Sequence, residues 1–114
     1  MLSTALRKRL LKFRIERDWE QFHSPRTLSV ALCVEAAELL EHFQWIDDAD
    51  VKRQAVVHRE EIAQEVADLA ILLTYFAHDL GLDFEKIVKR KLKINEQKYP
   101  IEKAKGSARK YSEL

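Results

Sequence analysis

Cysteine, glycine, proline and long apolar runs are all scarce in this chain of 114 residues. The single cysteine, Cys33, excludes an internal disulfide framework and is typical of a reducing compartment, so we expect a cytoplasmic protein. No apolar run approaches the roughly 20 residues of a membrane-spanning helix. The formal net charge is only +1, and so weak a field predicts neither a nucleic-acid polymer nor a membrane as partner.

Two glycines and two prolines leave few points at which a helix must break, and Ala, Leu, Glu, Lys and Arg are abundant. The composition therefore predicts an all-α protein. From the apolar periodicity we expect four helices: residues 4–19, a second from 24 or 27 to 43 or 45, 58–80 and 84–98. We also expect a helical or loose segment at 51–58 and an irregular tail at 101–114. Ser24 or Thr27 would cap the second helix, Gly81 would end the third, and Asp83 would cap the fourth.

The third predicted helix is apolar on nearly every side in its second half, over residues 69–76. Such a helix lies at the centre of a bundle or is covered by another subunit, and in a chain this small we favour the second arrangement. We therefore expect one domain over residues 1–114, bundle-like with four helices, whose core is completed in a homodimer or homotetramer. In the first helix, Leu6, Leu10 and Phe13 form the expected buried stripe.

Two acid pairs lie on otherwise apolar helix faces. Glu35 and Glu38 are three residues apart on the second predicted helix, and Glu65 and Asp68 repeat the spacing on the third. Residues at this spacing share one face of a helix, so each pair presents two carboxylates to one point. Buried like charges are unfavourable unless they are paired or bind a metal, and oxygen ligands suit Mg²⁺. The pattern predicts a metal site that recruits a polyphosphate.

Other interpretations use the same residues. A single Glu-x-x-Glu pair is common on solvated helix faces, and the acids would then belong to a helical interaction module with no enzymatic activity. A di-iron bundle needs Glu-x-x-His on two helices, but the only match, Glu20 to His23, runs into Ser24-Pro25 and argues against iron. Glu61, one turn before Glu65, is a candidate outer ligand or base.

Aromatic and basic side chains form a second set of candidates. Trp19, His23 and Trp45 lie near helix ends, where flat rings either stack on a base or cap the core. Cations and hydrogen-bond donors near the C-terminus would suit phosphate oxygens, although charged helix ends are more often simply solvated. The candidates are Lys91, Asn95, Lys98, Tyr99, Lys110 and Tyr111.

The acid pattern Glu35-Ala-Ala-Glu38 with Glu65-Val-Ala-Asp68 resembles the signature of the all-α nucleoside triphosphate pyrophosphohydrolases, the MazG-like group. The resemblance is closest to the dCTP pyrophosphatase branch. Four flanking stretches carry it: 17–26 (RDWEQFHSPR), the run that ends at Trp45, 97–100 (QKYP) and 106–114 (GSARKYSEL).

The resemblance implies a helical bundle that assembles as a dimer or a dimer of dimers, with Mg²⁺, or Mn²⁺ in its place, at the four acids. It implies cleavage of a (deoxy)nucleoside triphosphate, dCTP or a related nucleotide, to the monophosphate and pyrophosphate. Trp19, His23 and Trp45 become expected base and sugar contacts. The six C-terminal candidates become expected phosphate or sugar contacts.

In the mechanism we predict, a water attacks in line while the metal offsets charge on the triphosphate. Glu38 is the first candidate for the general base and Glu61 the second. No Ser, Cys or Lys lies in a nucleophile motif, so no covalent intermediate is expected. A nucleotide sensor that binds without hydrolysis remains the alternative, and the base preference stays open.

Overall fold

The computed structural model describes residues 2–114, which form helices joined by turns and loops, with no strand in that range. The all-α prediction is confirmed. The elements are α1 (Thr4–Glu16), η1 (Glu20–Phe22), α2 (Pro25–Glu41), η2 (Asp48–Asp50), α3 (Val51–Val57), α4 (Arg59–Asp79), α5 (Phe84–Lys98), α6 (Ile101–Ala104) and η3 (Tyr111–Glu113). Within the described residues, no helix is both long enough and apolar enough to cross a membrane. Two units, Leu2–Gly81 and Leu82–Leu114, are described in turn.

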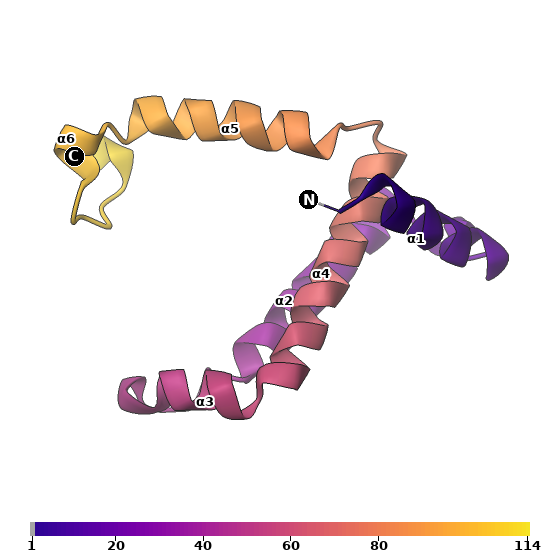
Figure 1. Cartoon of the computed structure of the whole chain (residues 1–114), viewed down its shortest axis with the longest axis horizontal. Helices are drawn as coiled ribbons and strands as arrows, with labels where there is room; N and C mark the ends of the chain where they lie inside the picture. The colour runs from indigo at the N-terminus through magenta and orange to yellow at the C-terminus, as the bar shows by residue number, and fades with distance from the viewer. Residues whose placement is uncertain (1) are drawn as a thin grey trace. The chain divides into compact units, whose positions relative to one another are not determined.

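The first unit is built on a hairpin in which α2 and α4 lie side by side and run in opposite directions, joined through α3 (Figure 1). Both predicted caps act at the start of α2. The Ser24 hydroxyl accepts from the Thr27 N–H at 3.1 Å, and the Thr27 hydroxyl oxygen accepts from the Ser24 N–H at 2.7 Å. This capping box satisfies two N–H groups that the helix start leaves free. At the same end of the hairpin, the C-terminus of α4 is followed by Gly81 with φ 65°, the predicted left-handed glycine.

The first helix is shorter than predicted. It ends at Glu16 rather than near residue 19, because Asp18 adopts a left-handed conformation with φ 55° and turns the chain. The predicted buried stripe is also wrong at two positions, since Leu6 and Phe13 are 39% and 41% exposed. The buried side chain of this helix is Arg14, which is only 2% exposed.

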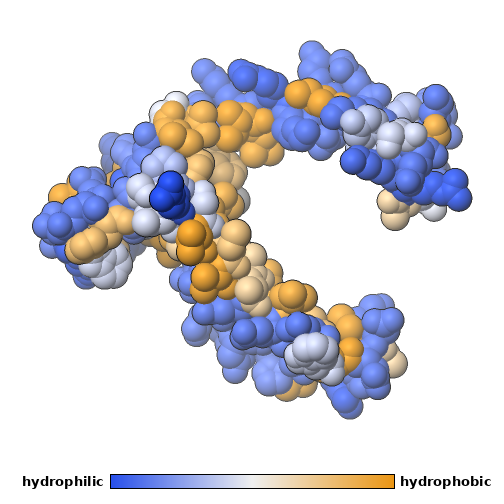
Figure 2. Space-filling view, turned by 180° about the vertical axis from the view of Figure 1, so that it is seen from behind, coloured by the Kyte–Doolittle hydropathy of each residue, from blue (hydrophilic) through white to orange (hydrophobic). Residues whose placement is uncertain are grey.

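Few apolar side chains of the described chain are buried; they are Leu28, Tyr75 and Ala77. The paired helices α2 and α4 instead leave large apolar residues exposed, among them Val30, Val34, Leu40, Val66 and Leu73. Figure 2 shows such apolar residues at the surface. A soluble bundle normally covers a larger share of these residues. A core that is completed by a second subunit therefore stays a prediction. The exposed apolar surface of α2 and α4 is compatible with it.

In the second unit, α5 has the bounds predicted from the sequence. The Asp83 carboxylate accepts from the Lys86 N–H at 3.1 Å and caps the helix, which ends at Lys98. The prediction of an irregular tail at 101–114 is wrong in part, because α6 and η3 lie within it. The Pro100 carbonyl accepts from the Ala104 N–H at 2.9 Å and so closes the short turn of α6.

Candidate active site

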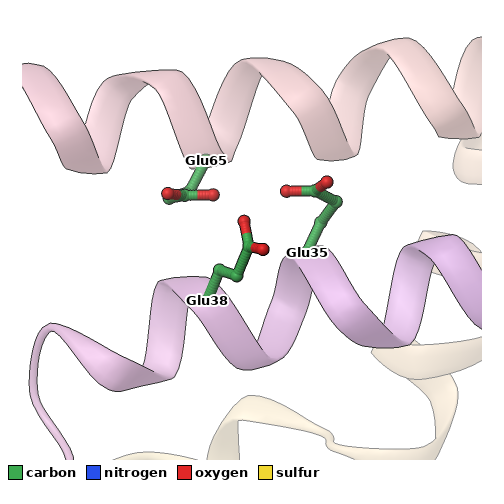
Figure 3. Close-up of side chains that lie close together, drawn as sticks. All are labelled: Glu35, Glu38 and Glu65. Carbon is green, nitrogen blue, oxygen red and sulfur yellow. The ribbon is translucent and has the colours of Figure 1, made fainter.

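Three of the four predicted metal ligands meet between the two helices of the hairpin. Glu35 and Glu38 project from α2 toward Glu65 of α4 (Figure 3), and one carboxylate oxygen from each lies within 4.8 Å of the other two. All three side chains are half-buried. The three-residue spacing places both α2 glutamates on the face that packs against α4, and Leu28 and Leu39 lie on or near this face. We call these three residues the glutamate cluster.

Proximity and partial burial hold protons in the glutamate cluster. Burial is the largest cause that raises the pKa of Glu35 to about 7, followed by the neighbouring carboxyl group of Glu38. The pKa of Glu65 is raised as well, first by burial and then by Glu38. Carboxylates this close cannot all ionise in the absence of a cation, so the cluster is poised to exchange protons for a metal.

Two oxygens of the cluster have no hydrogen-bond partner. Glu35 Oε2 and Glu65 Oε2 are both buried, and nothing among residues 2–114 donates to either. An acceptor that is shielded from water and has no hydrogen-bond partner destabilises the folded state. A hard divalent cation would satisfy both oxygens and offset the repulsion, and carboxylate oxygens are the ligands that Mg²⁺ and Mn²⁺ prefer. The donor set therefore fits such an ion.

Two further predicted acids lie at the edge of the cluster. Asp68, on the next turn of α4, is exposed, and its negative charge raises the pKa of both Glu35 and Glu65. It is not among the three residues whose oxygens converge within 4.8 Å. Glu61 is exposed on the preceding turn of α4 and is likewise outside that group.

The aromatic candidates occupy opposite ends of α2. His23 precedes the helix and Trp45 follows it, and a helix of 17 residues is about 25 Å long. Trp45 is 85% exposed, whereas Trp19 packs edge-to-face on Phe13 with ring centroids 5.6 Å apart. Both glutamates of α2 lie in its C-terminal half, toward Trp45. One chain therefore does not bring all three aromatic candidates to one point.

The remaining candidates belong to the second unit. Lys91, Asn95 and Lys98 are spaced to share one face of α5. Tyr99 and Tyr111 pack edge-to-face at 6.1 Å, and the Lys98 ammonium lies 4.6 Å from the centre of the Tyr111 ring. Lys110 lines an open hollow with two other basic residues, Lys103 and Arg109. Cations and phenol groups thus gather at this end of the chain.

A polar network that the sequence analysis missed joins α1 to α4. Arg14 Nη1 donates to Asp79 Oδ2 at 2.9 Å and Nη2 donates to Oδ1 at 2.7 Å. The guanidinium also lies 4.6 Å from the centre of the Tyr75 ring, and the Tyr75 hydroxyl donates to the Leu10 carbonyl at 2.9 Å. One signal was present in the sequence: Arg14 follows Leu10 by four residues and so falls on the apolar stripe.

The fold and the cluster define a class: an all-helical protein with a carboxylate site between two antiparallel helices. Comparison with known proteins specifies the family. The model of the MazG-like family matches residues 30–114. The chain is 41% identical over 111 residues to dCTP pyrophosphatase 1 from Rattus norvegicus and to its Homo sapiens counterpart, covering 96% of this chain. The chain spans 65% of the length of these curated relatives.

A solved structure agrees. The crystal structure of a pyrophosphatase from Archaeoglobus fulgidus DSM 4304 superposes with a TM-score of 0.81 at 36% sequence identity, over 84% of this chain and 90% of that one. The chain belongs to the MazG-like family.

Proposed function

We propose that this chain is a nucleoside triphosphate pyrophosphohydrolase that cleaves dCTP or a related deoxynucleotide to the monophosphate and pyrophosphate. The glutamate cluster carries the proposal, because a divalent cation would satisfy its two unpartnered, buried oxygens. The names of the relatives support it: two are dCTP pyrophosphatases and one is a pyrophosphatase.

In the proposed site, Glu35, Glu38, Glu65 and Asp68 hold Mg²⁺, or Mn²⁺ in its place. The bound ion supplies positive charge that offsets the triphosphate oxygens, which is much of what phosphoryl transfer requires. Glu38 lies between the other two members of the cluster and is our first candidate to orient a water and accept its proton. Glu61, exposed one turn from Glu65, is the second.

The proposed nucleotide contacts are divided by chemistry. Trp19 and Trp45 stack on the base, His23 donates to the nucleotide, and the six candidates of the second unit contact phosphate or sugar: Lys91, Asn95, Lys98, Tyr99, Lys110 and Tyr111. Because His23 and Trp45 lie at opposite ends of α2, we propose that a second copy of the chain completes each pocket in a homodimer or homotetramer. The exposed apolar residues of α2 and α4 support this assembly. We further propose that residues 1–114 act as one domain, in the cytoplasm.

The test is pyrophosphate release from a panel of all the ribo- and deoxynucleoside triphosphates in Mg²⁺. Wild-type protein should hydrolyse dCTP or a close relative fastest. Glu38→Gln and Asp68→Asn should each abolish turnover and leave the circular-dichroism spectrum helical. Glu41→Gln is the matched control, because Glu41 is exposed on the same helix and lies outside the cluster.

Other outcomes would replace the proposal. Full activity in both Glu38→Gln and Asp68→Asn would remove the acids from the mechanism. Binding of dCTP in Ca²⁺ with no turnover in Mg²⁺ would instead indicate a nucleotide sensor. Neither binding nor turnover would leave a helical interaction module.

A further inference from the structure

Arg14 is a buried cation of the first unit. Its side chain is 2% exposed, and both terminal nitrogens donate to the Asp79 carboxylate in a forked pair. Such a two-point contact fixes the guanidinium plane as well as its position. Below that plane lies the ring of Tyr75. The remaining hydrogens of the guanidinium therefore point in fixed directions.

One of those directions leads to His23. Arg14 Nη1 lies 3.3 Å from His23 Nδ1, in addition to its bond with Asp79. A guanidinium has only donors and is always protonated, so Nδ1 must accept. An Nδ1 that accepts carries no hydrogen, and the proton of a neutral imidazole is then on Nε2.

The surroundings of His23 favour the neutral ring. Burial and the positive charge of Arg14 lower the pKa of His23, although the negative charge of Asp79 opposes them. The other groups nearby are the Tyr75 ring, whose centroid is 5.6 Å from that of His23, and Glu20, whose carboxylate lies 3.8 Å from Arg14. Nothing among residues 2–114 accepts a hydrogen bond from His23 Nε2, so this donor is available to a ligand.

We propose that Arg14 is a positioning residue that holds His23 as the neutral Nε2–H tautomer, so that Nε2 donates to an uncharged oxygen of the base or sugar. This inference rests on the proposed function, in which His23 contacts the nucleotide. An uncharged donor matches a carbonyl or hydroxyl oxygen and gains less at a phosphate, which favours a cation. The opposite tautomer would bring the Nδ1 hydrogen against Nη1, two donors face to face.

The first test needs no nucleotide. Nitrogen-15 NMR of the imidazole groups in wild-type protein at pH 7.5, with the His23 signals assigned by their loss in His23→Gln, reports which nitrogen carries the hydrogen. We expect an unprotonated Nδ1 and a protonated Nε2. The reverse pattern, or a doubly protonated ring, would overturn the inference. Wild-type protein that hydrolyses no triphosphate would instead contradict the proposed function, so the two failures are distinguishable.

The second test separates positioning from simple structural support. Arg14→Met should raise the KM for the nucleotide by about 3- to 10-fold, the effect of one lost hydrogen bond, with kcat within about twofold. The same change made in His23→Gln protein should add nothing. Additive effects, or an unchanged KM in the folded variant, would overturn the inference. If Arg14→Met does not fold, Arg14→Lys is the second variant. It keeps the charge but loses the forked pair with Asp79, and it should raise the KM for the nucleotide in the same way.

The chain supplies a matched control. Arg7 Nη2 contacts His78 Nδ1 at 3.1 Å at an exposed position, an arginine–histidine contact of the same kind between α1 and α4. Arg7→Met removes that contact and should leave both the His23 spectrum and the KM unchanged. A KM shift equal to that of Arg14→Met would mean that docking of α1, rather than the His23 tautomer, sets the affinity, and would overturn the inference.

Discussion

Lowering the pH should weaken divalent-metal binding at the glutamate cluster, because the carboxyl oxygens that would hold the cation must first lose their protons. The pKa of Glu35 is raised to about 7. At pH 6 a group with this pKa is protonated in about ten molecules of every eleven, and at pH 8 in about one of eleven. The apparent Kd for Mg²⁺ should therefore rise about tenfold from pH 8 to pH 6 through this residue alone. A carboxyl group with an ordinary pKa would change the apparent Kd by less than about 10% over the same pH range.

The same pKa shift predicts the behaviour of the protein without metal. Since the pKa of Glu35 is raised above its usual 4.5, the folded chain binds an extra proton between about pH 4.5 and 7. The contribution of Glu35 to stability is then lost as the pH rises through this window. Glu35→Gln, which resembles the protonated acid, should match wild type at pH 5 in EDTA and should exceed its Tm at pH 8.

Isothermal titration with Mg²⁺ at pH 6, 7 and 8, together with calorimetric melting in EDTA, measures both effects. Glu41→Gln should reproduce the wild-type pH dependence, because Glu41 lies outside the cluster. A wild-type Kd that stays within about twofold from pH 6 to pH 8 would refute the reasoning. So would a Glu35→Gln protein that melts below wild type at pH 8 without metal.

Two further substitutions test individual residues. Trp45→Ala should raise the KM for the nucleotide by the equivalent of about 1–3 kcal/mol of lost stacking, with an unchanged Tm because the ring is 85% exposed. An unchanged KM in a steady-state assay would remove Trp45 from the proposed nucleotide contacts. Gly81→Ala should lower the free energy of unfolding by about 1–2 kcal/mol, because φ is 65° and a residue with a Cβ is strained in this conformation. The added Cβ meets no atom within 4 Å, so the effect comes from the backbone conformation alone. Urea denaturation measures it, and an equally stable variant would contradict the left-handed assignment.

Local chemistry made most of the helices predictable. Asp83 caps α5 and Gly81 follows α4, and both act within a few residues of their own position, so the sequence alone was sufficient to locate them. The end of α1 was missed because Asp18, a residue with a Cβ, adopts the left-handed conformation that usually marks a glycine. Nothing in the local sequence distinguishes such an aspartate from one in a helix.

The site was predictable to the extent that it depends on helix periodicity. The three-residue spacing alone predicts that Glu35 and Glu38 share one helix face. The same spacing of acids on a second apolar helix pointed to Glu65, and the structure brings all three together. The Arg14–Asp79 pair was not predictable, since its members are 65 residues apart and nothing in either helix identifies the other. A buried arginine can be inferred from its place on an apolar stripe, but its partner comes only from the three-dimensional arrangement.

The hairpin of α2 and α4 has a consequence for variation among family members. Its two helices are held in register by their own packing, while the 42–58 connection lies beyond the end of α2 and contributes none of the clustered glutamates. Insertions and deletions in that connection can therefore accumulate without moving the carboxylates. Alignments that anchor on the two helices and let the connection vary in length should keep Glu35, Glu38 and Glu65 in their columns.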